Sequence, residues 1–199
     1  MKTDFSNVLS YYNDRLSNSD CDSEKVGWGS VESQQERYSV LLEIGFTDGD
    51  SILDVGCGLG DLYGFLAPKF STINYKGVDI NPNAISIAIS KYPQVPFEIT
   101  NILNKKNDAF SYDYVVSSGA LSVPIDNQLE FVFLMLSRMY EFARKGVAVN
   151  FLSIYADRIE PGLYYMDPSK LLDMCLRISR KVVLRHDYFT HDLTVYIYR

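Results

Sequence analysis

The sequence predicts one α/β domain: a doubly wound, mostly parallel seven-stranded sheet with a C-terminal antiparallel hairpin, preceded by an N-terminal helical cap. Three observations support this prediction. Short apolar segments alternate with amphipathic ones from residue 51 to residue 178, a glycine-rich turn follows the first apolar segment, and two alternating segments close the chain. We expect residues 1–45 to form the cap and residues 46–199, which are enough to bury one full core, to form the sheet domain.

The charge and the cysteine pattern exclude several classes of protein. Asp and Glu outnumber Lys and Arg by 25 to 19, and no basic cluster is present, so neither duplex nucleic acid nor a membrane is an expected partner. The N-terminus lacks the apolar stretch of a signal peptide, and the longest clean apolar run, residues 131–136, is too short to span a membrane. Three cysteines without close spacing imply neither a disulfide framework nor a metal site. We therefore expect a soluble, cytoplasmic protein.

Two amphipathic helices are predicted in the cap. Apolar residues recur at helical spacing between residues 4 and 16, namely Phe5, Val8, Leu9, Tyr12 and Leu16. A second helix follows, for which Ser30 or Ser33 is the N-cap and Gly45 the end. The single tryptophan, Trp28, stands between two glycines in a polar loop, which indicates either a flap beside a binding site or an anchor for the cap.

The central feature of the sheet domain is the stretch from residue 51 to residue 66. Its first five residues are mostly apolar, as in a strand that is covered on both faces. The turn that follows has glycine at every second position, Gly56, Gly58 and Gly60. These glycines allow a sharp bend and the close approach of a ligand before a helix whose N-terminus also favours polar recognition. The next strand, residues 75–80, ends in Asp79, and an acidic residue at this place in a doubly wound sheet binds ribose hydroxyls.

The segments DVGCGLG (54–60) and VDINP (78–82) resemble the first and second motifs of class I S-adenosylmethionine (SAM)-dependent methyltransferases. The resemblance extends over about residues 46–199 and implies the sheet of that family, with SAM as the cofactor. It implies that Asp54 orients the amino group of SAM and that Asp79 binds its ribose. The cofactor-binding residues expected on this basis are Asp54, Gly56, Gly58, Gly60, Asp79, Ile80, Asn101, Ile102, Ser117, Trp28 and Arg37.

The resemblance implies roles for three further residues. Asn101 and the backbone of Ile102 contact adenine, and Ser117 lies near the sulfonium. Arg37, one helical turn after Gln34, either pairs with the methionine carboxylate of SAM or lies on a solvated helix face.

The remaining elements follow from apolar periodicity and from turn residues. Helices are predicted at residues 62–66, 82–92, 128–144 and 168–175, and strands at residues 97–100, 112–118, 146–153, 181–188 and 193–198. Asn81-Pro82 and Asp167-Pro168 each predict a capped helix start with proline at the first helical position. Residues 121–127 are expected to face the substrate, and the irregular residues 154–166 to form a lid.

Some side chains near these loops have two interpretations. Tyr155, Tyr164, Tyr165 and Tyr188 either line an aromatic substrate pocket or pack in the core. His186 and His191 are candidates for a general base, or are solvated residues near the hairpin turn. Methyl transfer from a sulfonium depends mainly on alignment in a dry site, so the sequence pattern names no catalytic residue.

The sequence therefore predicts a SAM-dependent methyltransferase that acts on a small molecule. One alternative is a regulatory protein that binds SAM or another nucleotide without turnover. Another is a dinucleotide-dependent oxidoreductase, which would need glycine at position 61, where the chain has Asp61. Residues 117–120 also lack the Asn/Asp-Pro-Pro-Tyr/Phe signature of enzymes that methylate nucleic-acid amines, so a base amine is disfavoured as the acceptor.

Overall fold

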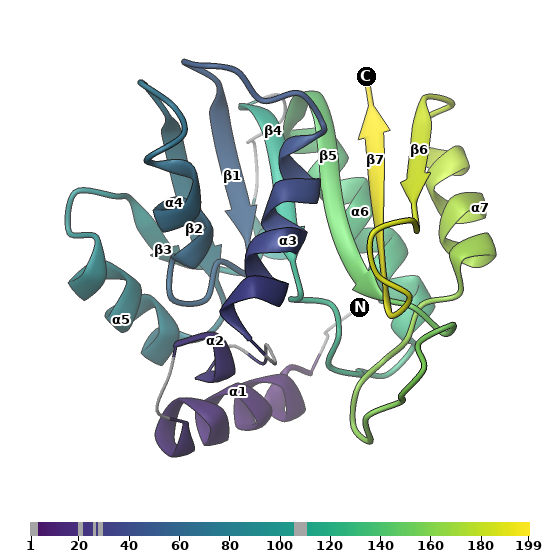
Figure 1. The fold of residues 1–199 in the computed structure, drawn as a ribbon, viewed down its shortest axis with the longest axis horizontal. Coiled ribbons are helices and arrows are strands. Elements are labelled where there is room, and N and C mark those ends of the chain that lie inside the picture. Colours follow the sequence, from purple (N-terminus) through teal and green to yellow (C-terminus); the bar gives the residue numbers. More distant parts are fainter. Residues whose placement is uncertain (1–3, 20–21, 26, 28–29, 106–110) are drawn as a thin grey trace.

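A seven-stranded sheet forms the centre of the structure, a computed structural model that describes residues 4–19, 22–25, 27, 30–105 and 111–199 (Figure 1). The bounds are β1 Ser51–Val55, β2 Asn74–Asp79, β3 Phe97–Ile99, β4 Tyr112–Ser118, β5 Ala143–Leu152, β6 Val182–Arg185 and β7 Asp192–Tyr198. The strand order is β3-β2-β1-β4-β5-β7-β6. Neighbours from β3 to β5 are parallel, and β7 is antiparallel to both β5 and β6. The predicted doubly wound sheet with a C-terminal antiparallel hairpin is confirmed.

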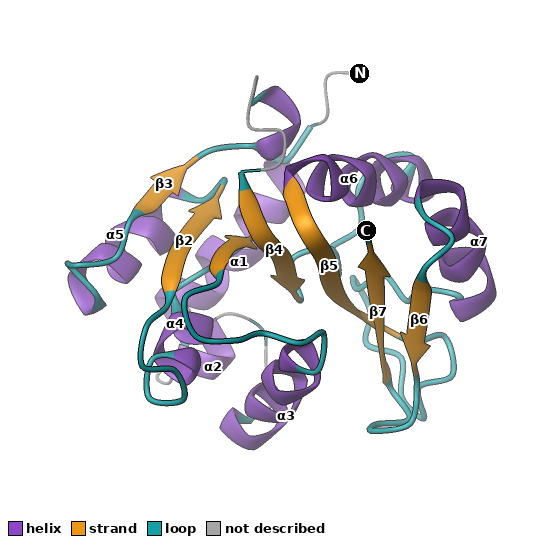
Figure 2. Cartoon of the chain, turned by 90° about the horizontal axis from the view of Figure 1, so that it is seen from above, coloured by secondary structure: helices purple, strands orange, loops and turns teal. Residues whose placement is uncertain are grey.

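Helices cover both faces of this sheet (Figure 2). Their bounds are α1 Ser6–Asn18, α2 Asp22–Lys25, α3 Val31–Leu42, α4 Asp61–Leu66, α5 Pro82–Lys91, α6 Gln128–Phe142 and α7 Pro168–Ile178, with a 3-10 turn, η1, at Ile102–Asn104. α3 and α4 lie on one face, and α6 and α7 lie on the other. α1 and α2 lie beyond the end of the sheet toward which β1 and β5 point (Figure 1).

The strand β1 contributes to a hydrophobic core on each face of the sheet. Ile52 packs in the cluster that contains Tyr38 and Leu41 of α3, and Leu53 and Val55 pack in the cluster beneath α6. This arrangement explains the nearly unbroken apolar run of β1, because a strand covered on both faces needs apolar side chains on each. Since α3 shares a core with β1, the division into a cap of residues 1–45 and a separate sheet domain stays a prediction.

The helix starts agree with the predicted caps. The Oγ of Ser30 accepts from the N–H of Ser33 at 3.1 Å and so begins α3. Asn81 and Asp167 accept backbone N–H groups at the starts of α5 and α7, and proline follows each of them. These caps satisfy donors that have no partner within the helix, so the starts are readable from the sequence.

Several boundaries differ from the prediction by one to three residues, and two of these differences have a visible cause. α1 continues to Asn18 because the side chains of Ser17 and Asn18 donate to carbonyl groups of Asn13 and Asp14, one turn earlier. β5 begins three residues earlier than predicted, at Ala143, because its backbone pairs with β4 from that residue onward. Among the described residues, no helix is both long and apolar enough to cross a membrane.

Candidate functional site

The glycine turn between β1 and α4 is fastened to the end of β2. The N–H groups of Gly56 and Cys57 both donate to the carbonyl oxygen of Val78, at 2.8 and 3.1 Å. Gly56 has a φ of +75°, and a Cβ atom there would lie 2.2 Å from the Cβ of Ala120, which follows β4. Glycine therefore permits both the left-handed backbone and the close contact between the two strand ends. The polar recognition expected from the helix N-terminus stays a prediction, because α4 has only six residues and the N–H groups of Gly56, Cys57 and Gly58 already donate to Val78 and Asp79.

Asp79 connects the two sequence motifs. Its Oδ2 accepts from the N–H of Gly58 at 2.9 Å, and its Oδ1 accepts from the N–H of Asn81 at 2.8 Å. Burial raises the pKa of this carboxyl group, and the backbone N–H donors oppose the rise. Each carboxylate oxygen has a further lone pair, so Asp79 holds the turn in place and still offers acceptors to a ligand.

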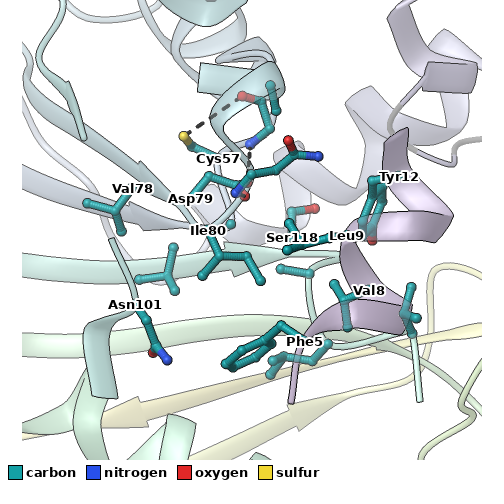
Figure 3. A pocket seen from close by; sticks show the side chains of 18 of the residues that line it. Phe5, Val8, Leu9, Tyr12, Cys57, Val78, Asp79, Ile80, Asn101 and Ser118 are labelled. Carbon is teal, nitrogen blue, oxygen red and sulfur yellow. Dashed lines mark hydrogen bonds between the residues drawn. The ribbon is translucent and has the colours of Figure 1, made fainter. Parts of the chain in front are cut away.

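A cavity lies over the glycine turn and Asp79, with an empty volume of about 1080 Å³ that includes the space at its mouth (Figure 3). We call it the first cavity. Its walls include residues 55–58, 78–81 and 100–102, the side chains of Ser118, Ala120, Phe131 and Met135, and the apolar face of α1 with Phe5, Val8, Leu9 and Tyr12. The carboxyl ends of β1, β2 and β4 thus meet at one crevice, where ligands bind in doubly wound sheets.

The first cavity fits the adenosine part of SAM. The Oδ1 of Asn101 accepts from the N–H of Leu103 at 2.9 Å, which leaves one lone pair of that oxygen for an adenine amino group. Ile80 and Ile102 add apolar wall for a ring. The buried Oγ of Ser118, like that of Ser117, has no hydrogen-bond partner among the described residues, and only Ser118 lines the cavity.

Six of the expected cofactor residues line the first cavity: Gly56, Gly58, Asp79, Ile80, Asn101 and Ile102. Gly60 and Ser117 do not. A Cβ atom at Gly60 would meet the ring of Phe97 at 2.8 Å, so this glycine serves packing behind the turn. Side chains alternate along β4, and Ser117 is 1% exposed inside the sheet while Ser118 faces the cavity. The expected contact of Ser117 with the cofactor stays a prediction, and its neighbour Ser118 is the serine that lines the first cavity.

Asp54 also lies outside the first cavity. Its side chain is 2% exposed, and its Oδ2 accepts from the hydroxyl of Tyr75 at 2.6 Å. Burial raises the pKa of Asp54 to about 7; the Tyr75 hydroxyl opposes this rise, and the charges of Asp79 and Asp61 add to it. The carboxyl group thus ties β1 to β2, and its expected contact with the amino group of SAM stays a prediction.

The substitution Asp54→Asn is expected to flatten the pH dependence of stability. Because the pKa of Asp54 is higher in the folded state, its contribution to stability is fully present below about pH 4 and is lost as the pH rises through about 7. The free energy of unfolding of the variant, minus that of the wild type, should therefore rise by about 3 kcal/mol between pH 4 and pH 8. Urea unfolding at each pH measures this difference.

Asp50→Asn is the matched control for that series. Burial of Asp50 raises the pKa of its carboxyl group, but Lys145 and Thr47 outweigh this effect and the net pKa is lowered. The stability that Asp50 contributes is therefore lost only at lower pH than the range tested. The unfolding free energy of the variant minus that of the wild type should stay flat with pH for Asp50→Asn and rise with pH for Asp54→Asn. Equal curves for the two variants would contradict this prediction.

Arg37 is buried, and it lies apart from the first cavity. Arg37 and Gln34 are each 5% exposed, so the alternative of a solvated helix face is wrong. The Nη2 of Arg37 lies 2.6 Å from the Oδ2 of Asp192 on β7. Its expected pairing with the carboxylate of SAM stays a prediction, and Trp28 lies outside the described residues.

The helix α1 is held to the rim of the first cavity by hydrogen bonds. The hydroxyl of Tyr12 donates to the carbonyl of Gly119 at 3.3 Å, and the Oδ1 of Asn13 accepts from the side chains of Asn81 and Asn83, at 3.0 Å each. The sequence predicts the apolar face of this helix but not its partners. Its contacts show that this face covers the ends of β2 and β4.

A second cavity adjoins the first. It is lined by Tyr11, Tyr12, Gly27, Ser33, Arg37, Gly119, Ser122, Leu152, Asp157, Arg158, Glu160, Leu163, Tyr165 and His191. Tyr12 lines both cavities, and Gly119 lies between Ser118 and Ala120 of the first cavity. Only Tyr165 of the four tyrosines expected in an aromatic pocket lines either described cavity. The irregular residues 154–166 provide much of the wall, in the place expected of a lid.

Comparison with known proteins shows that the chain is similar to methyltransferases. Residues 53–146 match a family model described as a methyltransferase domain. A candidate methyltransferase of Mycobacterium tuberculosis is 29% identical over 160 residues, which are 75% of this chain and 93% of that protein.

Two solved structures share the fold. Magnesium protoporphyrin IX methyltransferase from Synechocystis, with bound S-adenosylhomocysteine (SAH), has a TM-score of 0.71 and 18% identity, and the match covers 98% of this chain and 100% of that one. A phosphoethanolamine N-methyltransferase from Haemonchus contortus, with phosphomonomethylethanolamine and SAH, has a TM-score of 0.67 and 15% identity over 87% of this chain and 46% of its own. Residues 53–146 thus match the methyltransferase domain family, and the chain as a whole has the fold of class I SAM-dependent methyltransferases.

Proposed function

We propose that the protein transfers the methyl group of SAM to a small molecule bound in the second cavity. The observation that carries this proposal is the junction of the two cavities at Tyr12 and Gly119. The first cavity has a carboxylate and an adenine-sized apolar wall, as an adenosyl group requires. The second shares Tyr12 with it and is lined by polar and aromatic side chains, as is typical of a small-molecule site.

In this proposal each part of the first cavity has one task. The carboxylate of Asp79 accepts from the ribose hydroxyls, and charge-assisted hydrogen bonds of this kind are stronger than neutral ones. Asn101 contacts the adenine amino group, and the backbone of Gly56 lets the ligand approach the turn. Ser118 presents its hydroxyl to the ligand near the end of β4. SAM supplies a methyl group on a positively charged sulfur, which makes the carbon reactive without a further catalyst.

The chain contributes binding, alignment and the exclusion of water. The apolar side chains of α1 cover the first cavity, so a bound cofactor is shielded from solvent on that side. Alignment of two reactants in a dry site accelerates a bimolecular reaction strongly even without acid or base catalysis. The net charge of −6 also suits a small acceptor better than a nucleic acid.

The proposal is tested by calorimetry with SAM, SAH and NAD. We expect SAM and SAH to bind and NAD to bind more weakly, because position 61 is occupied by an aspartate whose Oδ1 lies 2.5 Å from the Nζ of Lys91. Asp79→Ala should weaken the affinity for SAH at least about tenfold, because the variant loses both the ribose acceptors and the support of the Gly58 N–H.

Asp173→Ala, at an exposed position on α7 that lines neither described cavity, is the matched control and should leave the affinity unchanged. Unchanged SAH affinity in Asp79→Ala would refute the ribose assignment. Tighter binding of NAD than of SAH would refute the proposed function as a whole.

A further inference from the structure

The structure distinguishes between the two histidines. The carbonyl of His191 accepts from the N–H of Ser153 at 2.9 Å, which fixes the residue at the carboxyl end of β5. Its side chain is 43% exposed and lines the second cavity. The Nε2 of His186 instead lies 2.8 Å from the Oγ of Ser153, its ring packs against Tyr155, and it lines neither described cavity.

The ring of His191 is held from two sides. It stacks on Phe189, with centroids 5.0 Å apart and planes at 13°. Its Nε2 lies 3.5 Å from the Oδ2 of Asp192, the same carboxylate oxygen that pairs with Arg37. A carboxylate beside Nε2 favours the tautomer with hydrogen on that nitrogen, so Nδ1 carries the lone pair. His191 is thus presented to the second cavity as a proton acceptor.

We propose that His191 is the proton acceptor in methyl transfer and that Asp192 is its positioning residue; this inference rests on the proposed function. The nucleophilic atom of the acceptor forms the new bond to the methyl carbon, and the sulfur keeps the electron pair of the bond that breaks. The proton of the acceptor moves to Nδ1 of His191. The acceptor is therefore of a class that keeps its proton at neutral pH until attack, such as an alcohol, a phenol or an amine, because a carboxylate or a thiolate needs no base.

Charged groups from two parts of the chain lie beside His191 or line the second cavity with it. From the body of the protein these are the carboxylate of Asp192 and the guanidinium of Arg37. From the lid they are Asp157, Arg158 and Glu160, which line the same cavity with opposite charges. The phenols of Tyr11, Tyr12 and Tyr165 complete the wall.

The test measures the pKa of each histidine by NMR in complexes with SAM and with SAH. The two ligands differ by one methyl group and one positive charge, which is located where the methyl is transferred. If the second cavity lies beside the sulfonium of bound SAM, the positive charge of the sulfur opposes protonation of His191. The pKa of His191 should then be lower with SAM than with SAH by at least about 0.5. The pKa of His186 should differ by much less between the complexes. His186→Asn and His191→Asn assign the signals.

Nitrogen chemical shifts in the same samples report the tautomer. Hydrogen on Nε2 of His191 is expected in the wild type, and Asp192→Asn should reduce that preference. Equal pKa values of His191 with SAM and SAH would overturn the inference, as would a neutral ring with hydrogen on Nδ1. If neither ligand binds, the proposed function itself fails, so the two failures are distinguishable.

Discussion

Alanine at position 56 is expected to reduce the affinity for SAH at least about 100-fold, which corresponds to about 2.7 kcal/mol. A Cβ atom at this position would lie 2.2 Å from the Cβ of Ala120 and 3.6 Å from its Cα. The clash cannot be relieved by a side-chain rotation, because alanine has none. The segment after β4 must therefore move away from the turn, and Ser118 and Ala120, which both line the first cavity, move with it.

Gly49→Ala separates this clash from the general cost of a side chain on a left-handed backbone. Gly49 has a φ of +85°, close to the +75° of Gly56, but a Cβ atom there meets nothing within 4 Å. In Gly49→Ala the only cost should be backbone strain, which lowers the unfolding free energy by about 1–2 kcal/mol. This variant should bind SAH normally. Calorimetry and urea unfolding of both variants give the comparison.

The two variants are expected to differ in both measurements. Gly56→Ala should lose more stability than Gly49→Ala and should lose ligand affinity in addition, because only Gly56 lies between two strand ends that form the binding crevice. Equal affinity for SAH in the two variants would show that the first cavity is not the cofactor site.

Most of the fold is predictable from the sequence because its signals are local. The apolar run of β1, the caps at Ser30, Asn81 and Asp167, and the alternating hairpin strands each report the structure of a few neighbouring residues. The glycine turn and Asp79 are equally local, and both line the first cavity. Boundaries differ by a few residues where side chains such as that of Asn18 extend a helix end.

The parts of the site that the sequence does not predict depend on contacts between distant segments. Whether Ser117 or Ser118 faces the ligand depends on how β4 is rotated in the sheet, and neighbouring serines give no pattern from which to choose. Arg37 is polar and in a helix, so its burial becomes visible only with Asp192, 155 residues later. The second cavity likewise combines α1, α3, residues 154–166 and the hairpin turn.

Arg37→Met is expected to destabilise the protein by about 3–5 kcal/mol at neutral pH. Arg37 and Asp192 are 5% and 1% exposed, and removal of the guanidinium leaves a buried carboxylate without its cationic partner. The double variant Arg37→Met/Asp192→Asn removes the charge as well, so it should lose less stability than the sum of the single variants. Arg185→Met is the control: that arginine is 28% exposed beside a Glu43 that is 48% exposed, and the loss should be below about 1 kcal/mol.

The pH dependence of the loss identifies its cause. Burial raises the pKa of Asp192, against the opposing charge of Arg37, so without Arg37 the carboxyl group is protonated at still higher pH. The folded variant then keeps a neutral Asp192 at low pH and must bury a charge at high pH, so its deficit should grow from pH 5 to pH 8. The double variant has no carboxyl group there, and the wild type itself loses stability with rising pH because the pKa of Asp192 is raised, so the deficit of the double variant should shrink and not grow. A deficit in Arg37→Met that does not change with pH would mean that the loss comes from packing of the arginine side chain and not from the unpaired charge.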